Sequence, residues 1–129
     1  MWKMFLLAFC LLPSVGCVTV SPEEQAATNS NAALQVTCAG VEDCELKWAR
    51  ALDWVQRNSR WKLRNATDTV ITTEGPLDST DAAFEITKFP LGNGSYEIRF
   101  RAGCGNMFGC VPSILQLTAD FKVAVMYGS

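Results

Sequence analysis

A chain of 129 residues in which 49% are hydrophobic and 19% are charged is typical of one small globular domain. The formal net charge is only −2 and both signs are mixed along the chain, so neither nucleic acid nor an anionic membrane surface is an expected partner. Histidine is absent, which excludes serine–histidine and cysteine–histidine catalytic pairs and removes the commonest metal ligand. The composition therefore predicts a protein that is not an enzyme.

Residues 1–16 have the pattern of a secretory signal peptide. Lys3 supplies a positive charge, and residues 4–12 form an apolar run that is too short to remain as a membrane span. The following "SVGC" resembles a bacterial lipobox, in which the cysteine is lipidated and becomes the mature N-terminus. Ser14 departs from that pattern, which favours Leu at this position. An ordinary signal-peptidase site at the same bond is the alternative, and it would give a plain secreted protein.

The number of cysteines favours lipidation at Cys17. Of the six cysteines, Cys10 leaves with the signal peptide, so five remain in the mature chain. A thioether to acyl-bearing lipid, with palmitate as the typical chain, uses Cys17 and leaves four cysteines that pair evenly. Val18 is not the Asp that retains Gram-negative lipoproteins in the inner membrane. The resemblance therefore implies a lipid anchor in the outer membrane, with the protein facing the periplasm.

The mature chain divides into a tether and one domain. The segment "VTVSPEEQAATNSNA" is small and polar and contains no aromatic residue, so it cannot bury enough apolar surface to fold. We therefore expect a lipidated N-terminus and flexible tether over residues 17–32 and a single folded domain over residues 33–129. A domain of this size is expected to need disulfides for stability.

The first half of the domain predicts a strand and then a helix. Alternation in "ALQVTC" places Val36 and Cys38 on one face of a short strand. Apolar residues then recur at helical spacing from Val41 onwards, and "RNS" ends the helix. On the helical wheel Trp48 lies within the apolar stripe and is expected in the core. Trp54 lies nearer the charged residues, so we expect it to be partly exposed, packed at the helix end or touching a partner.

The second half predicts strands and a final helix. "WKLRNATDTVITTEGP" is rich in β-branched residues, but its alternation slips between Leu63 and Val70, which predicts one long strand with a bulge or bend. "AAFEITKFPLGNGSYEIRFRAGC" predicts a hairpin with its turn at "PLGNGS". "PSILQLTADFKVAVMYGS" predicts a helix with an apolar stripe through Leu117 and Phe121.

This order, β-α-β-β-β-α, predicts an α+β fold: an antiparallel-rich sheet of about four strands with two helices on one face. The strand that carries Ile98 also carries Glu97, Arg99 and Arg101 at positions of opposite parity. These three side chains are therefore expected on the open face of the sheet, where the two cations suit an acidic partner.

Two cysteine pairs share one spacing, in "CAGVEDC" and "CGNMFGC". Zinc knuckles use shorter spacers, and dithiol oxidoreductases use C-x-x-C, so neither a metal nor a redox cofactor is expected. Disulfides are expected instead. Local pairs, Cys38 with Cys44 and Cys104 with Cys110, would clamp two strand-to-helix joints. The alternative is the crossed pairing of Cys38 with Cys104 and Cys44 with Cys110, which requires the first and fourth strands to run the same way.

The loop between the second pair of cysteines carries Met107 and Phe108 at its tip. Exposed, these apolar side chains would form an adhesive contact for a partner. Buried, they would close the end of the sheet. The sequence leaves both interpretations open.

The stretches "RALDWVQRNSRWKLRNATDTVITTEGP" and "NGSYEIRF" resemble small bacterial lipoprotein domains of unknown function. The fold of those domains is like the TATA-box-binding protein or helix-grip proteins, the broad class of the outer-membrane-assembly lipoprotein BamC. The resemblance covers about half of the chain and implies no DNA binding.

The predicted function is that of a non-enzymatic, outer-membrane-anchored lipoprotein. It binds another envelope component, expected to be a protein, through the open sheet face or the joint loops, and no small-molecule substrate is indicated. The alternative is a secreted or anchored inhibitor or immunity protein. Such a protein would insert the loop 105–109 into an enzyme such as a lysozyme or a toxin.

Overall fold

The computed structural model describes residues 19–128, which form an α+β domain with a five-stranded antiparallel sheet. The strand order across the sheet is β1-β5-β4-β3-β2. Within the described residues there is one more strand and one more helix than the sequence predicts. The elements are α1 (Pro22–Ala32), β1 (Thr37–Ala39), α2 (Val41–Asn58), β2 (Leu63–Ala66), β3 (Val70–Thr73), β4 (Ala83–Gly92), β5 (Ser95–Gly103) and α3 (Ile114–Tyr127).

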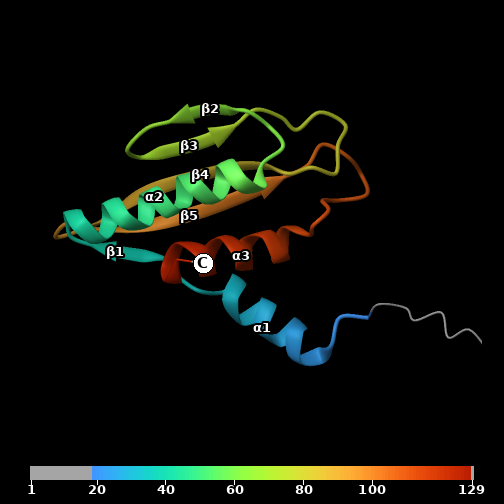
Figure 1. The fold of residues 1–129 in the computed structure, drawn as a ribbon, viewed down its shortest axis with the longest axis horizontal. Coiled ribbons are helices and arrows are strands. Elements are labelled where there is room, and N and C mark those ends of the chain that lie inside the picture. Colours follow the sequence, from blue (N-terminus) through green and yellow to red (C-terminus); the bar gives the residue numbers. More distant parts are fainter. Residues whose placement is uncertain (1–18, 129) are drawn as a thin grey trace, which may run out of the picture.

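The core lies between the sheet and the helices α2 and α3 (Figure 1). Strand residues of one parity are buried there, among them Ile71, Phe84, Ile86 and Ile98. Trp54 of α2 is 1% exposed and makes edge-on contacts with Phe84, Phe100 and Phe121 at ring-centroid distances of 5.1, 5.6 and 5.3 Å. Large aromatic side chains bury the most apolar area per residue, so this cluster stabilises the packing of both helices on the sheet.

The two tryptophans of α2 differ from the sequence-based expectation. Trp54 is at the centre of the core, and Trp48 is only half-buried at its edge. The fully buried face of α2 runs through Ala51, Trp54 and Val55, so the helix is rotated relative to the predicted stripe. The indole of Trp54 is accommodated in the core because its N–H has a hydrogen-bond partner at the edge of the core, Asp120.

The stretch that predicts one long bent strand is instead the hairpin β2–β3. The Oγ1 of Thr67 accepts hydrogen bonds from the N–H groups of Val70 and Thr69 at 3.0 and 3.3 Å, and the N–H of Thr67 donates to the carbonyl of Val70 at 2.8 Å. These short-range bonds make a turn of residues 67–69. The slip in the hydrophobic alternation is therefore a change of strand.

The segment expected to be a flexible tether contains the helix α1. Ser21 and Glu24 form a capping box, with hydrogen bonds of 3.2 and 3.1 Å, and Pro22 occupies the first turn. None of the residues of α1 is buried. The helix lies beside α3, and the ammonium of Lys122 donates to the carbonyl of Ala32 at 2.7 Å (Figure 1). Cys17, the expected site of lipidation, lies outside the described residues.

Both predicted local disulfides are present and the crossed pairing is not. Cys38 bonds Cys44, and Cys104 bonds Cys110. β1 pairs antiparallel with β5, so Cys38 lies opposite Tyr96, near the beginning of β5, whereas Cys104 directly follows the end of that strand. The two disulfides are therefore at opposite ends of the sheet, beyond the reach of a shared bond.

Candidate binding surfaces

The first candidate surface is the open face of the sheet. Arg99 and Arg101 project from it, as the sequence predicts, with side chains that are 48% and 82% exposed. Each arginine has a carboxylate on the same face: Arg99 lies 3.2 Å from Glu97, and Arg101 lies 3.5 Å from Glu85. These four groups carry no net charge together. The open face therefore does not present the pair of free cations that the strand alone suggests.

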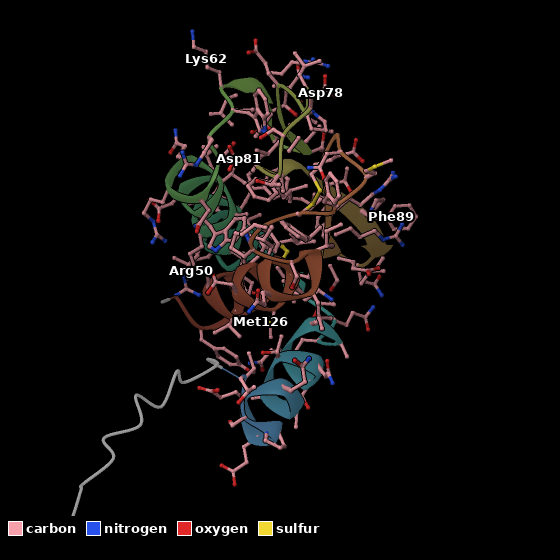
Figure 2. All side chains as sticks on the ribbon, turned by 90° about the vertical axis from the view of Figure 1, so that its right-hand side faces the viewer. Arg50, Lys62, Asp78, Asp81, Phe89 and Met126 are labelled. Atoms are coloured by element: carbon pink, nitrogen blue, oxygen red, sulfur yellow. A yellow bond between two sulfur atoms is a disulfide. The ribbon has the colours of Figure 1, made fainter. Side chains whose placement is uncertain are left out.

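Phe89 of β4 lies on the same face and points away from the helices (Figure 2). The guanidinium of Arg99 stacks over its ring, 4.0 Å from the centroid. This stacking covers part of the Phe89 side chain, which is still 46% exposed. A wet, charge-balanced face is ordinary for an antiparallel sheet with helices on one side only, so exposure here is no argument for a partner.

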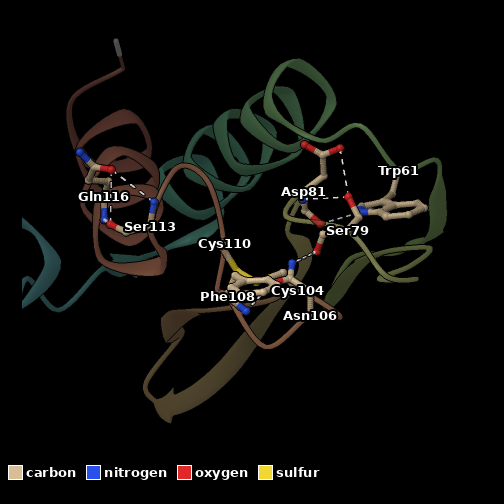
Figure 3. The surroundings of a disulfide bond; sticks show 9 residues. All are labelled: Trp61, Ser79, Asp81, Cys104, Asn106, Phe108, Cys110, Ser113 and Gln116. Atoms are coloured by element: carbon tan, nitrogen blue, oxygen red, sulfur yellow. Dashed lines mark hydrogen bonds between the residues drawn. A yellow bond between two sulfur atoms is a disulfide. The ribbon is translucent and has the colours of Figure 1, made fainter.

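The second surface is the loop between β5 and α3. Met107 and Phe108 are 90% and 89% exposed, which settles the question that the sequence leaves open. The Cys104–Cys110 bond closes the loop (Figure 3). The side-chain amide of Asn106 donates to the carbonyl of Ser79 at 2.6 Å and accepts from the N–H of Phe108 at 2.7 Å. The apolar tip is therefore held in place from both sides.

The β3–β4 loop supports this tip. The N–H of Val111 donates to the carbonyl of Thr80 at 3.0 Å. Gly105 lies so close to the same loop that a Cβ atom would be 3.1 Å from the carbonyl oxygen of Pro76. The two loops together make one surface, the loop end, which exposes four apolar side chains: Leu77 (78%), Met107, Phe108 and Val111 (68%).

The third surface is an apolar groove of about 630 Å³ beside the N-terminal half of α2. We call it the α2 groove. Trp48 lines it, and its indole N–H donates to the carbonyl of Thr67 in the β2–β3 turn at 2.9 Å. Its other walls include Cys44, Leu52 and Tyr96, and Glu45 and Asp68 add two carboxylates.

Lys88 of β4 brings a positive charge into the α2 groove. Its ammonium lies 4.9 Å from the ring centroid of Trp48 and 5.6 Å from that of Tyr96. Both rings therefore attract the cation through their electron-rich faces. Within residues 19–128 the ammonium makes no hydrogen bond or ion pair. Its donors are available to an acceptor that enters the groove.

Sequence reasoning missed this groove because it placed Trp48 in the core. A signal was present in β4, where Phe84, Ile86 and Lys88 alternate on the side that faces the helices. A lysine in that register predicts that the helical layer ends there and that solvent reaches the strand. The groove itself combines α2, the β2–β3 turn and the β4–β5 hairpin, and no local pattern joins these segments.

Comparison with known proteins gives no relative: no protein-family model, no curated protein and no solved structure matches the chain. Among the residues that the structure describes, no helix is long and apolar enough to cross a membrane.

Proposed function

We propose that this chain is a non-enzymatic lipoprotein, anchored in the outer membrane and facing the periplasm, that binds a segment of a protein partner in the α2 groove. The observation that carries the proposal is the pairing of Trp48 and Tyr96 around the ammonium of Lys88. Tryptophan and tyrosine dominate the binding energy of many protein interfaces because they bury large area at little cost in conformational entropy.

The chemistry of the groove indicates the kind of segment it accepts. Its walls are mostly apolar, so an apolar side chain of the partner would gain by leaving water. The ammonium of Lys88 suits a neutral acceptor next to that side chain, such as a carbonyl oxygen, because Glu45 and Asp68 already give the groove a net negative charge. Because Thr67 holds the indole of Trp48 and a disulfide holds the beginning of α2, binding requires little ordering of the groove.

The lipid anchor is supported by the signal pattern and by the cysteines. The four cysteines of residues 33–129 are paired in two disulfides, so Cys17 is the odd thiol of the mature chain. From the sequence resemblance we further propose kinship with small lipoproteins of the TATA-box-binding-protein-like class. That kinship adds nothing to the function proposed for the groove.

Site-specific photocrosslinking in intact cells tests the groove. p-Benzoylphenylalanine replaces Glu45 in the groove wall, and a matched chain carries it at Arg57, which is exposed, lies beside the C-terminal end of α3 and does not line the groove. We expect a discrete protein adduct from position 45 only. Trp48→Ala should reduce its yield by roughly tenfold or more, because truncating a central aromatic residue costs about 2 kcal/mol of binding.

Lys88→Gln is the second variant, because it removes the charge and leaves Trp48 in place. It should also weaken the adduct, with an unchanged melting temperature. Adducts that are the same from positions 45 and 57, or that survive both substitutions, would reject the groove as the binding site.

Lipidation at Cys17 is tested separately. The mass of the N-terminal peptide should show acyl chains on Cys17, and Cys17→Ser should move the protein from the membrane to the soluble fraction. A wild-type protein that is as soluble as the variant would reject the anchor.

A further inference from the structure

Along the long axis of the domain, the loop end and the N-terminus of α1 lie at the same end, although across that end they are apart: Asp78 is at the top of Figure 2 and α1 is at the bottom. The long axis of the domain is horizontal in Figure 1, and α1 and α3 both begin at the right-hand end of it. The β3–β4 and β5–α3 loops are at that end too, and they face the viewer in Figure 2. The β4–β5 turn and the beginning of α2, which border the α2 groove, lie at the opposite end.

The length of chain before α1 limits how far this end can be from an anchor. Four residue steps separate Cys17 from Ser21, the N-cap of α1. Even fully extended, four steps span at most about 14 Å. On the proposed lipidation at Cys17, on which this inference rests, the beginning of α1 is therefore held close to the bilayer surface. The loop end reaches the same surface when the long axis of the domain stands away from the bilayer.

The loop end has the composition of a membrane-contacting surface. Leu77, Met107 and Phe108 are exposed by 78%, 90% and 89%, and they come from two loops that brace each other through Asn106 and Gly105. Apolar patches on a soluble surface mark places where another apolar phase is bound. Several apolar side chains on two loops suit a broad, deformable surface better than the narrow active site of an enzyme.

We propose that the loop end inserts into the headgroup region of the same leaflet that holds the anchor. Leu77, Met107 and Phe108 enter the boundary between headgroups and acyl chains, while the neighbouring carboxylate of Asp78 stays in water and keeps the insertion shallow. Anchor and loops then fix the orientation of the domain: its long axis stands away from the bilayer, and the α2 groove is at the far end, directed into the periplasm.

Photocrosslinking to lipid tests this contact. The full chain, matured in cells and purified in detergent, carries p-benzoylphenylalanine in place of Phe108 and is reconstituted into liposomes of phosphatidylethanolamine and phosphatidylglycerol. The matched chain carries the same group in place of Leu91, which is 50% exposed and is the second-last residue of β4, next to the β4–β5 turn at the opposite end of the domain. After illumination, mass spectrometry counts phospholipid adducts. We expect the adduct yield at 108 to exceed that at 91 by about tenfold or more, because burying one large apolar side chain shifts an equilibrium by that factor.

Met107→Ser in the chain labelled at 108 should lower the yield, because it removes a neighbouring apolar contact from an exposed position that the fold does not need. Equal yields at positions 108 and 91 would overturn the inference. A protein adduct at 108 in intact cells, without a lipid adduct, would also overturn it and would assign the loop to a pocket of a protein, as in an inhibitor.

The acyl mass of the N-terminal peptide is read from the same samples. An acylated chain without lipid adducts at 108 rejects only the docking of the loop end. A chain without acyl groups rejects the anchor and the docking that rests on it. The groove adducts from position 45 are measured independently of both.

Discussion

The indole N–H of Trp54 donates a hydrogen bond of 2.9 Å to a carboxylate oxygen of Asp120, which joins α2 to α3. Trp54 is 1% exposed, whereas Asp120 lies on the exposed side of α3. The indole N–H, the only polar group of the Trp54 side chain, is thus satisfied from the rim of the core. This bond explains how a tryptophan fits among the phenylalanine rings at the centre of the domain.

Asp120→Ala should destabilise the domain although Asp120 itself is exposed. The substitution leaves the buried N–H of Trp54 without a partner, which costs about 1–3 kcal/mol of unfolding free energy. Asp120→Asn retains an acceptor oxygen and should cost less. Urea unfolding of the three proteins gives the comparison. Equal stability of the alanine variant and the wild type would show that water reaches the indole.

The two faces of β5 predict opposite responses to mutation. Ile98 is 2% exposed, so Ile98→Ala should cost about 2–5 kcal/mol through the cavity that it leaves. Arg99 and Arg101 make exposed ion pairs, so each alanine substitution should cost less than about 1 kcal/mol. Thermal unfolding of all three variants measures this. Similar losses for the isoleucine and arginine variants would contradict the observed facing of the strand.

Removal of each disulfide should destabilise the domain to a different degree. A closed loop of about seven residues contributes roughly 2.4 kcal/mol through the entropy of the unfolded chain. Cys104→Ala with Cys110→Ala should cost about this amount. Cys38→Ala with Cys44→Ala should cost more, because these two cysteines are also buried, at 2% and 5% exposure. Urea unfolding without reductant compares them. A larger loss for the Cys104–Cys110 pair would contradict this ranking.

Asp43 predicts a loss of stability in acid. The backbone N–H of Ala39 donates to its carboxylate at 3.0 Å and the ammonium of Lys47 at 3.1 Å, and these bonds lower the pKa of Asp43 from its ordinary value of 3.8. A lowered pKa in the folded state stabilises the protein above pH 3.8, and this contribution is lost as the pH falls from there through the folded-state pKa.

Melting temperatures measured from neutral pH down to about pH 2.5 test this linkage. Asp43→Asn should be less stable than the wild type near neutrality, and the difference should shrink as the pH falls below 3.8. Asp53→Asn is the matched control, because Asp53 also pairs with a residue four positions further along α2 but, within the part of the chain that the structure describes, accepts no backbone hydrogen bond. An acid loss that is the same in both variants would exclude Asp43 as its source.

The sequence predicts those parts of the fold that depend on local patterns. Alternation identifies the face of Ile98, and the position of each cysteine pair at a strand-to-helix joint indicates local disulfides. The β2–β3 hairpin was not predicted, because Thr67 makes a turn with its own side chain in a stretch that has strong β propensity throughout. Likewise, the capping box of Ser21 and Glu24 favours a helix in a segment that has no apolar face.

The binding surfaces were predicted less well because they depend on packing. The register of β5 gives the facing of Arg99 and Arg101, but their neutralisation requires Glu85, which comes from the neighbouring strand. The exposure of Met107 follows from the way Asn106 bonds the β3–β4 loop, a contact between segments 27 residues apart. Trp48 was misplaced because the rotation of α2 on the sheet is decided by the shapes of the core residues beneath it.

Each disulfide joins two cysteines that follow each other in the sequence, so the two bonds can form in the order in which the cysteines emerge. A chain that crosses a membrane N-terminus first presents Cys38 and then Cys44 before either cysteine of the second pair has emerged. Oxidation of each cysteine with the next one to appear yields both native bonds. On the proposed lipidation of Cys17 and removal of Cys10 with the signal peptide, no competing thiol precedes them, and the native connectivity then forms without disulfide isomerisation.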